Sequence, residues 1–197
     1  MEQLLKTAEP ILIKQDPVLG ELIKSQTLNL RAPRKDYFTS LCRSIVGQQV
    51  SVAAATAIFG RLLAATGIKP AKVLQLSDEE IRAIGLSKQK VGYIRDLAAH
   101  FANNPDVYNH LGQRTDEQVI TELTEIKGIG VWTAQMFLIF TLGRADVFAP
   151  DDLGLQNAMK KLYGWDKVPP KKELTAIAEN WAPYRTIASL HLWQSLK

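Results

Sequence analysis

The chain has 197 residues, and 46% of them are hydrophobic. This length and apolar content suit one domain or two closely packed lobes, and they exclude a disordered chain. The net charge of +4 permits binding to a polyanion without requiring it. The single cysteine, Cys42, excludes a disulfide framework or a cysteine-based metal site within one chain, and its apolar surroundings predict an inert core thiol. No run of 18 apolar residues and no signal-peptide pattern is present, which predicts a cytoplasmic protein, or a nuclear one in a eukaryote.

Helical periodicity dominates the chain, and no stretch shows the sustained period of two that marks a strand. The sequence therefore predicts an all-α fold in one compact domain over residues 1–197. Ser77-Asp-Glu-Glu80 is a capping box at one helix start, and Gly67, Gly85 and Gly143 stand where helices should stop. Helices are predicted, in chain order, near residues 2–14, 17–25, 36–49, 51–66, 70–75, 77–83, 87–103, 116–126, 131–142, 153–163, 171–181 and 184–195.

Two adjacent glutamines stand between apolar helices in the segment Gly47-Gln-Gln-Val-Ser51. One interpretation is a polar turn in which Ser51 caps the next helix. The other is a loop that reaches a nucleic-acid duplex. A second turn, around Gly85, also joins two helices, and we favour an ordinary helix end there over a DNA-facing turn that uses Lys88 and Lys90.

The most informative stretch is a candidate helical hairpin, in which Lys127-Gly-Ile-Gly130 joins an amphipathic run to a second apolar run. Its glycines leave backbone N–H groups uncovered at the start of the second helix, where the helix dipole favours an anion. The carbonyl groups on the other side of the hairpin suit a monovalent cation that bridges to the anion. The sequence predicts contacts to a DNA backbone phosphate from Lys127, Gly128, Gly130 and Thr133.

A pair of carboxylates, Asp151 and Asp152, follows Pro150 at a predicted helix start. Aspartate is a favoured N-cap, so simple capping accounts for at least one of them. Chemistry would need only one carboxylate in a cleft, and no third acid close by in the sequence completes a metal site. The three histidines stand at no recognisable spacing from a nucleophile and are predicted to be structural: His100, His110 and His191.

Four segments follow one another along the chain: Ile45-Val-Gly-Gln-Gln-Val-Ser51, Ile126-Lys-Gly-Ile-Gly-Val-Trp-Thr-Ala134, Asp146-Val-Phe-Ala-Pro-Asp-Asp152 and Pro183-Tyr-Arg-Thr-Ile-Ala-Ser-Leu-His-Leu-Trp193. In this order they resemble the alkylbase branch of the helix-hairpin-helix DNA glycosylases, of the bacterial 3-methyladenine DNA glycosylase II type. The resemblance covers roughly residues 36 to 197.

The resemblance implies two helical lobes with the active site in the cleft between them, and removal of alkylated bases from double-stranded DNA by a monomer. It assigns the catalytic acid to Asp152 rather than Asp151, and base-pocket positions to Trp132 and Trp193. Gln49 falls where the family has the wedge that fills the hole left by a flipped nucleotide, a position that is leucine in the bacterial relative. This chain is too short for the β-rich N-terminal lobe of that relative.

Two departures from other branches of the superfamily narrow the expected chemistry. Members with lyase activity carry a lysine where this chain has Trp132, so we expect a monofunctional glycosylase. Members of the endonuclease III type end in a four-cysteine iron–sulfur site, which Cys42 alone cannot form. No cofactor is expected beyond the cation at the hairpin. Two rivals remain open, a non-enzymatic DNA-binding module and a metal-dependent nuclease that uses both aspartates.

Overall fold

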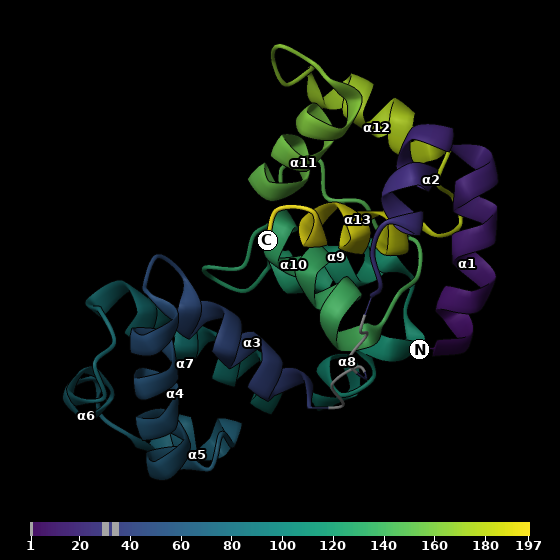
Figure 1. Ribbon diagram of the computed structural model, residues 1–197. Coiled ribbons are helices and arrows are strands. Elements are labelled where there is room, and N and C mark those ends of the chain that lie inside the picture. Colours follow the sequence, from purple (N-terminus) through teal and green to yellow (C-terminus); the bar gives the residue numbers. More distant parts are fainter. Residues whose placement is uncertain (1, 29–31, 33–35) are drawn as a thin grey trace. The chain divides into compact units, whose positions relative to one another are not determined.

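The computed structural model describes residues 2–28, 32 and 36–197, and every regular element in these residues is helical (Figure 1). The described residues contain no strand, so the predicted all-α fold is confirmed. None of their helices is long and apolar enough to cross a membrane.

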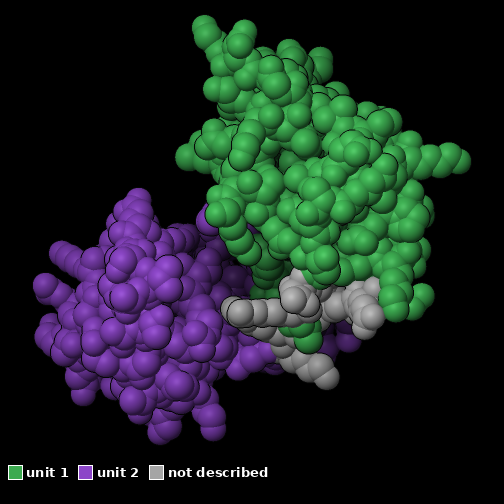
Figure 2. All heavy atoms as spheres, in the orientation of Figure 1, with its two compact units in different colours: residues 1–33, 138–197 green, residues 34–137 purple. Residues whose placement is uncertain are grey.

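The chain divides into two compact units, which Figure 2 shows in different colours. Unit 1 comprises residues 1–33 and 138–197, and unit 2 comprises residues 34–137. The chain thus leaves unit 1, builds all of unit 2, and then returns to complete unit 1. The candidate hairpin lies in unit 2, and the aspartate pair lies in unit 1.

Unit 2 is built around one long helix, α7 (Lys88–Asn103), which packs against α3 and α5. Its buried residues recur with the helical period, so the apolar face continues from end to end; they are Val91, Ile94, Leu97, Ala98 and Phe101. The other helices of unit 2 are α3 (Tyr37–Gly47), α4 (Val52–Thr66), α5 (Pro70–Gln75), α6 (Asp78–Ala83), α8 (Pro105–Tyr108), the 3₁₀ helix η1 (Leu111–Gln113), α9 (Asp116–Thr124) and α10 (Val131–Phe137).

Local capping chemistry sets several of these boundaries. The predicted capping box is present, because Ser77 Oγ accepts from Glu80 N and the Glu80 carboxylate accepts from Ser77 N. A second capping box, Thr115 with Gln118, starts α9. The sequence prediction missed α8 and η1, which are too short to show a period, although Pro105 at the first position of α8 is a typical helix start.

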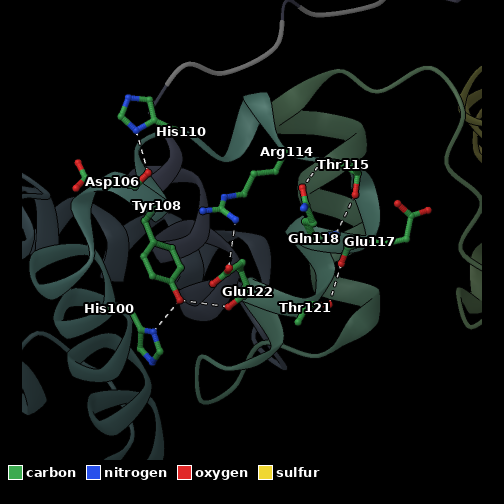
Figure 3. A network of polar contacts seen from close by, with 10 residues as sticks. All are labelled: His100, Asp106, Tyr108, His110, Arg114, Thr115, Glu117, Gln118, Thr121 and Glu122. Carbon is green, nitrogen blue, oxygen red and sulfur yellow. Dashed lines mark hydrogen bonds and ion pairs between the residues drawn. The ribbon is translucent and has the colours of Figure 1, made fainter.

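A polar network joins α7, α8 and α9 within unit 2 (Figure 3). His100 Nδ1 lies 2.7 Å from the Tyr108 hydroxyl, which also donates to the Glu122 carbonyl at 3.3 Å. Burial, followed by nearby carboxylates such as Glu122, raises the pKa of Tyr108 to about 12, so the phenol keeps its proton and remains a donor. His100 and His110 are thus in hydrogen-bonded structural positions, as the sequence predicts.

Unit 1 has a buried carboxylate at its centre. Asp16 caps α2 by accepting from Leu19 N, and it also accepts from the Tyr163 hydroxyl and from Trp181 Nε1 at 2.8 Å. Trp181 is completely buried, so this carboxylate joins α2 to the C-terminal helices. The helices of unit 1 are α1 (Glu2–Gln15), α2 (Pro17–Lys24), the π-helix η2 (Leu138–Leu142), α11 (Leu153–Tyr163), α12 (Lys171–Glu179) and α13 (Arg185–Gln194).

Several predicted helices are longer than the observed ones, including those predicted over 36–49 and 116–126, which end at Gly47 and Thr124. The helix predicted over 131–142 is α-helical only to Phe137 and then π-helical over 138–142. The helix predicted over 171–181 ends at Glu179, where Asn180 takes the C-cap position. Hydrophobic periodicity does not distinguish an α-turn from a π-turn, since both keep the same residues near the core.

Candidate functional site

The hairpin between α9 and α10 uses its two glycines for different reasons. Gly128 has a left-handed backbone, with φ of 83°, and a Cβ there would lie 2.3 Å from the Tyr93 ring. Gly128 is therefore required by the fold itself. Gly130 is exposed, and a Cβ there would meet no atom within 4 Å. Of the two, Gly130 is the glycine whose missing side chain leaves the backbone open to a ligand.

The start of α10 has the properties of an anion site. The first turn of any helix leaves backbone N–H groups without intrahelical partners, and the bond from Ala134 N to Gly130 O marks where the helical ladder begins here. The helix dipole adds positive potential at the same end. Val131 and Trp132 in this turn are 50% and 44% exposed, so the turn lies at the surface of the described chain.

Two residues predicted to bind phosphate have other partners or positions. Lys127 donates its backbone N–H to Asp96 Oδ2 at 2.8 Å, and its ammonium lies 3.4 Å from Asp96 Oδ1. A carboxylate thus already occupies one predicted N–H donor of the hairpin. Thr133 is buried, with only 6% of its surface exposed, so little of it is open to a ligand in this structure. The DNA contact predicted for Thr133 stays a prediction.

The turn after α3 presents Gln49 on an unusual backbone. Gln49 is exposed and has φ of 55°, a left-handed conformation that few residues other than glycine adopt. Two apolar side chains next to it are exposed as well, Val50 at 40% and Val52 at 84%. Ser51 caps α4 by accepting from Ala54 N, as the structural interpretation of this segment predicts.

Gln48 and Gln49 differ in their surroundings within this turn. Gln49 is exposed, whereas Gln48 is partly buried and donates from Nε2 to the Gly128 carbonyl of the hairpin at 2.8 Å. Lys90 Nζ donates to the carbonyls of Val46 and Gln48, at 2.8 and 2.6 Å. The Lys90 ammonium thus caps the end of α3, whereas Lys88, the other lysine of the DNA-facing alternative that we did not favour, is exposed.

The aspartate pair separates into an exposed and a buried carboxylate. Asp151 is exposed and forms an ion pair with Lys171. Asp152 is 9% exposed and is the N-cap of α11, where its Oδ1 accepts from Leu155 N at 2.8 Å. The capping role is therefore taken by Asp152, the same residue that the resemblance assigns to catalysis.

Trp193 lies directly on the Asp152 carboxylate. Its indole Nε1 donates to Asp152 Oδ1 at 2.9 Å, and its ring lies 5.7 Å from the exposed ring of Phe140. A Cβ on Gly154 would lie 2.9 Å from Asp152 Oδ1 and 3.2 Å from Trp193 Cδ1, so glycine at this position permits the contact. Unit 1 thus brings two predicted site residues together, while Gln49 and Trp132 belong to unit 2.

The loop that precedes Asp152 is anchored to the start of α13. Arg185 binds the Asp146 carboxylate with two N–H groups, at 2.7 and 2.9 Å. Burial disfavours the charged form of Asp146, but the hydrogen bonds and charge of Arg185 outweigh that effect and lower its pKa. Thr186 adds bonds to Val147 and, through its backbone N–H, to the Ala145 carbonyl. The motif at residues 146–152 and the motif at residues 183–193 are therefore joined by hydrogen bonds.

Sequence reasoning missed the residues that support this site, namely Gln48, Lys90, Asp96, Gly154 and Arg185. Gln48 lies in the motif at residues 45–51 and Arg185 in the motif at residues 183–193. Their positions in these motifs are the sequence feature that could have identified them. Asp96 lies in an ordinary amphipathic helix with no local signal, and the sequence placed Lys90 near a turn without indicating its partners.

Comparison with known proteins agrees with this geometry. The model of the HhH-GPD superfamily base excision DNA repair proteins matches residues 42–183. The chain is 39% identical over 181 residues to a Saccharomyces cerevisiae DNA-3-methyladenine glycosylase, covering 83% of this chain and 61% of that protein.

Two solved structures are similar over nearly the whole chain. A Bacillus halodurans DNA-3-methyladenine glycosidase has a TM-score of 0.86 and 39% identity, covering 97% of this chain and 90% of that one. The Schizosaccharomyces pombe 3-methyladenine DNA glycosylase in complex with abasic DNA has a TM-score of 0.82 and 31% identity, covering 95% of each chain. The resemblance drawn from the four motifs is confirmed: the chain belongs to the HhH-GPD superfamily of base excision DNA repair proteins.

Proposed function

We propose that the protein is a monofunctional DNA glycosylase, which flips alkylated bases of the 3-methyladenine and 7-methylguanine type out of duplex DNA and excises them hydrolytically. The observation that carries the proposal is the buried Asp152 carboxylate, held by the Leu155 N–H and by the indole of Trp193. The similarity to proteins named DNA-3-methyladenine glycosylase supports the choice of substrate.

The chemistry follows from the charge of the substrate. Alkylation of a purine ring nitrogen makes the base cationic and a good leaving group, so a general acid is less needed. The departing base leaves an oxocarbenium-like sugar, as in glycoside hydrolysis. An ionised Asp152 stabilises that cation and orients or deprotonates the attacking water.

Aromatic residues provide the selection for charge. The face of a tryptophan ring attracts a cation, by about 2 kcal/mol or more when the pair is desolvated. Trp132 and Trp193 take this base-binding role in the proposal. Trp193 then has two functions, since the same residue that presents a ring also donates its N–H to Asp152.

DNA binding is assigned to the hairpin and to the Gln49 turn. The open backbone at Gly130 and the first turn of α10 bind a phosphate, and Gln49 acts as the wedge that supports base flipping. Lys127 contributes less than the sequence suggests, because Asp96 shares its charge.

A monovalent cation at the hairpin is part of this proposal, with backbone carbonyls as its ligands. The Ile126 carbonyl accepts from Ile129 N, and the Gly128 carbonyl accepts from Gln48. A carbonyl oxygen has two lone pairs, so these bonds leave one acceptor position on each. Binding of duplex DNA should be stronger in potassium chloride than in choline chloride of equal concentration, and equal affinities would argue against the cation.

The proposal is tested by base release from a methylated duplex in the presence of EDTA. Free 3-methyladenine or 7-methylguanine, identified by chromatography, is the expected product, together with intact abasic DNA. A non-enzymatic binding module would release no base, and a metal-dependent nuclease would be inactive in EDTA. A covalent adduct trapped by borohydride would contradict the monofunctional mechanism.

Selection by charge has its own test. Excision of 3-methyladenine should exceed that of the neutral lesion hypoxanthine after correction for their intrinsic leaving-group rates. Trp132→Ala should reduce this corrected ratio. If both rates fall by the same factor, Trp132 serves packing and not charge recognition.

A further inference from the structure

Hydrogen bonds join the turn that carries Gln49 to two other elements of unit 2. Lys90, in the first turn of α7, bonds the carbonyls of Val46 and Gln48. Gln48 bonds the Gly128 carbonyl in the hairpin. The turn between α3 and α4 is thus connected to α7 on one side and to the phosphate-binding hairpin on the other.

The strain at Gln49 explains why such support is needed. A left-handed backbone is unfavourable at a residue other than glycine, and it persists only where its surroundings enforce it. The carbonyls that Lys90 bonds lie at the C-terminal end of α3, where backbone acceptors lack helical partners and the dipole favours a cation. Lys90 is partly buried, and the loss of hydration lowers the pKa of its ammonium.

We propose that Lys90 and Gln48 are positioning residues for base flipping, which hold the Gln49 turn in its inserting conformation and couple it to the hairpin. Neither residue contacts substrate in this role. The inference rests on the proposed function, since it assumes that Gln49 is the wedge. It predicts that phosphate binding and wedge insertion occur as one concerted docking step, because the Gln48 side chain joins the two elements directly.

The test uses Lys90→Met, which keeps the aliphatic stem and removes the donors. Single-turnover excision of a lesion in a fully paired duplex should slow about tenfold, which corresponds to about 1.4 kcal/mol. Excision of the same lesion placed in an unpaired bulge should change less than twofold, because flipping is no longer required. Lys90→Arg should restore most of the rate on paired DNA, since it keeps the charge and the donors.

The matched control is Lys88→Met, which removes an exposed positive charge two residues earlier on α7. The logarithm of the affinity for undamaged DNA falls linearly with the logarithm of the salt concentration. Removing a lysine that contacts a phosphate should reduce the slope of this dependence by about one. Lys90→Met should leave that slope unchanged. A reduced slope for Lys90→Met, or equal slowing on paired and unpaired lesions, would overturn the proposal.

Gln48→Met provides a second and independent test, because it breaks only the bond to the hairpin. It should slow excision from paired DNA while leaving excision from the bulge intact. If neither variant separates the two substrates although the wild-type protein releases base, the positioning role is wrong and the glycosylase function stands. If the wild-type protein releases no base from either substrate, the proposed function itself fails.

Discussion

The contact between Trp193 and Asp152 can be tested by replacing the tryptophan with phenylalanine. Trp193→Phe keeps an aromatic ring beside Phe140 and removes the indole N–H that donates to Asp152 Oδ1 at 2.9 Å. The bond from Leu155 N to the same oxygen remains. The substitution therefore removes one hydrogen bond to the carboxylate and leaves an aromatic ring beside it.

The expected loss follows from the strength of that bond. A hydrogen bond to a charged group contributes about 1.5–3 kcal/mol. Because the carboxylate must face the developing sugar cation, part of this energy is expressed in the transition state. Loss of about 1.4 kcal/mol there lowers the rate about tenfold. We expect the single-turnover excision rate of 3-methyladenine to fall by about that factor.

The assay compares the excision rate with the affinity for DNA containing an abasic site. The affinity should change less than twofold, because Asp152 acts mainly in the transition state. Trp165→Phe is the matched control, since Trp165 belongs to the same unit and stacks on Tyr163, with ring centroids 4.9 Å apart. An unchanged rate for Trp193→Phe, or an equal fall for Trp165→Phe, would show that the bond from Trp193 to Asp152 does not support excision.

Three other predictions concern the aspartates, the hairpin and the pH dependence of folding. Asp152→Asn should abolish base excision with little loss of DNA binding, whereas Asp151→Asn should be milder, and equal losses in the excision assay would contradict the assignment. Gly130→Ala should keep the thermal stability of the protein but weaken binding to damaged and undamaged duplexes alike, which a binding titration measures. Gly128→Ala should instead lower the melting temperature, because of its left-handed backbone and the aromatic ring already in contact; similar melting temperatures for the two variants would show that this reading of the hairpin is wrong. Burial lowers the pKa of His191 from 6.5 to about 4, so the unfolded chain takes up the proton first as the pH falls. The free energy of unfolding should therefore fall as the pH is lowered from 6.5 to 4, by at most about 3 kcal/mol from this residue. In His191→Gln, the free energy of unfolding measured by urea denaturation should depend less on pH over that range. The same pH dependence in the variant and the wild-type protein would contradict this prediction.

Local signals in the sequence were sufficient to predict most helices. Hydrophobic periodicity locates them, and capping residues such as Ser77 and Ser51 set where they begin. These signals act over three or four residues along the chain, so no tertiary information is needed to recognise them. The hairpin was also visible, because two glycines between amphipathic runs form a short local pattern.

The functional residues were predicted from the resemblance to a family and not from local helix signals. The four motifs in order identify the family, and the comparisons confirm that membership. The individual roles of Asp152, Trp132 and Gln49 stay predictions for the experiments above. The sequence did suggest that one aspartate caps a helix, but it did not indicate that Asp152 would both cap α11 and meet Trp193.

Only the tertiary structure decided which polar groups support the site. Trp193 meets Asp152 across 41 residues, Gln48 meets Gly128 across 80, and Lys90 meets Val46 across 44. Such bonds join one side chain to one distant partner, so they leave no period and no local pattern in the sequence. The physical reason is that a hydrogen bond is specified by the positions of two atoms in space, and those positions exist only after the helices have packed.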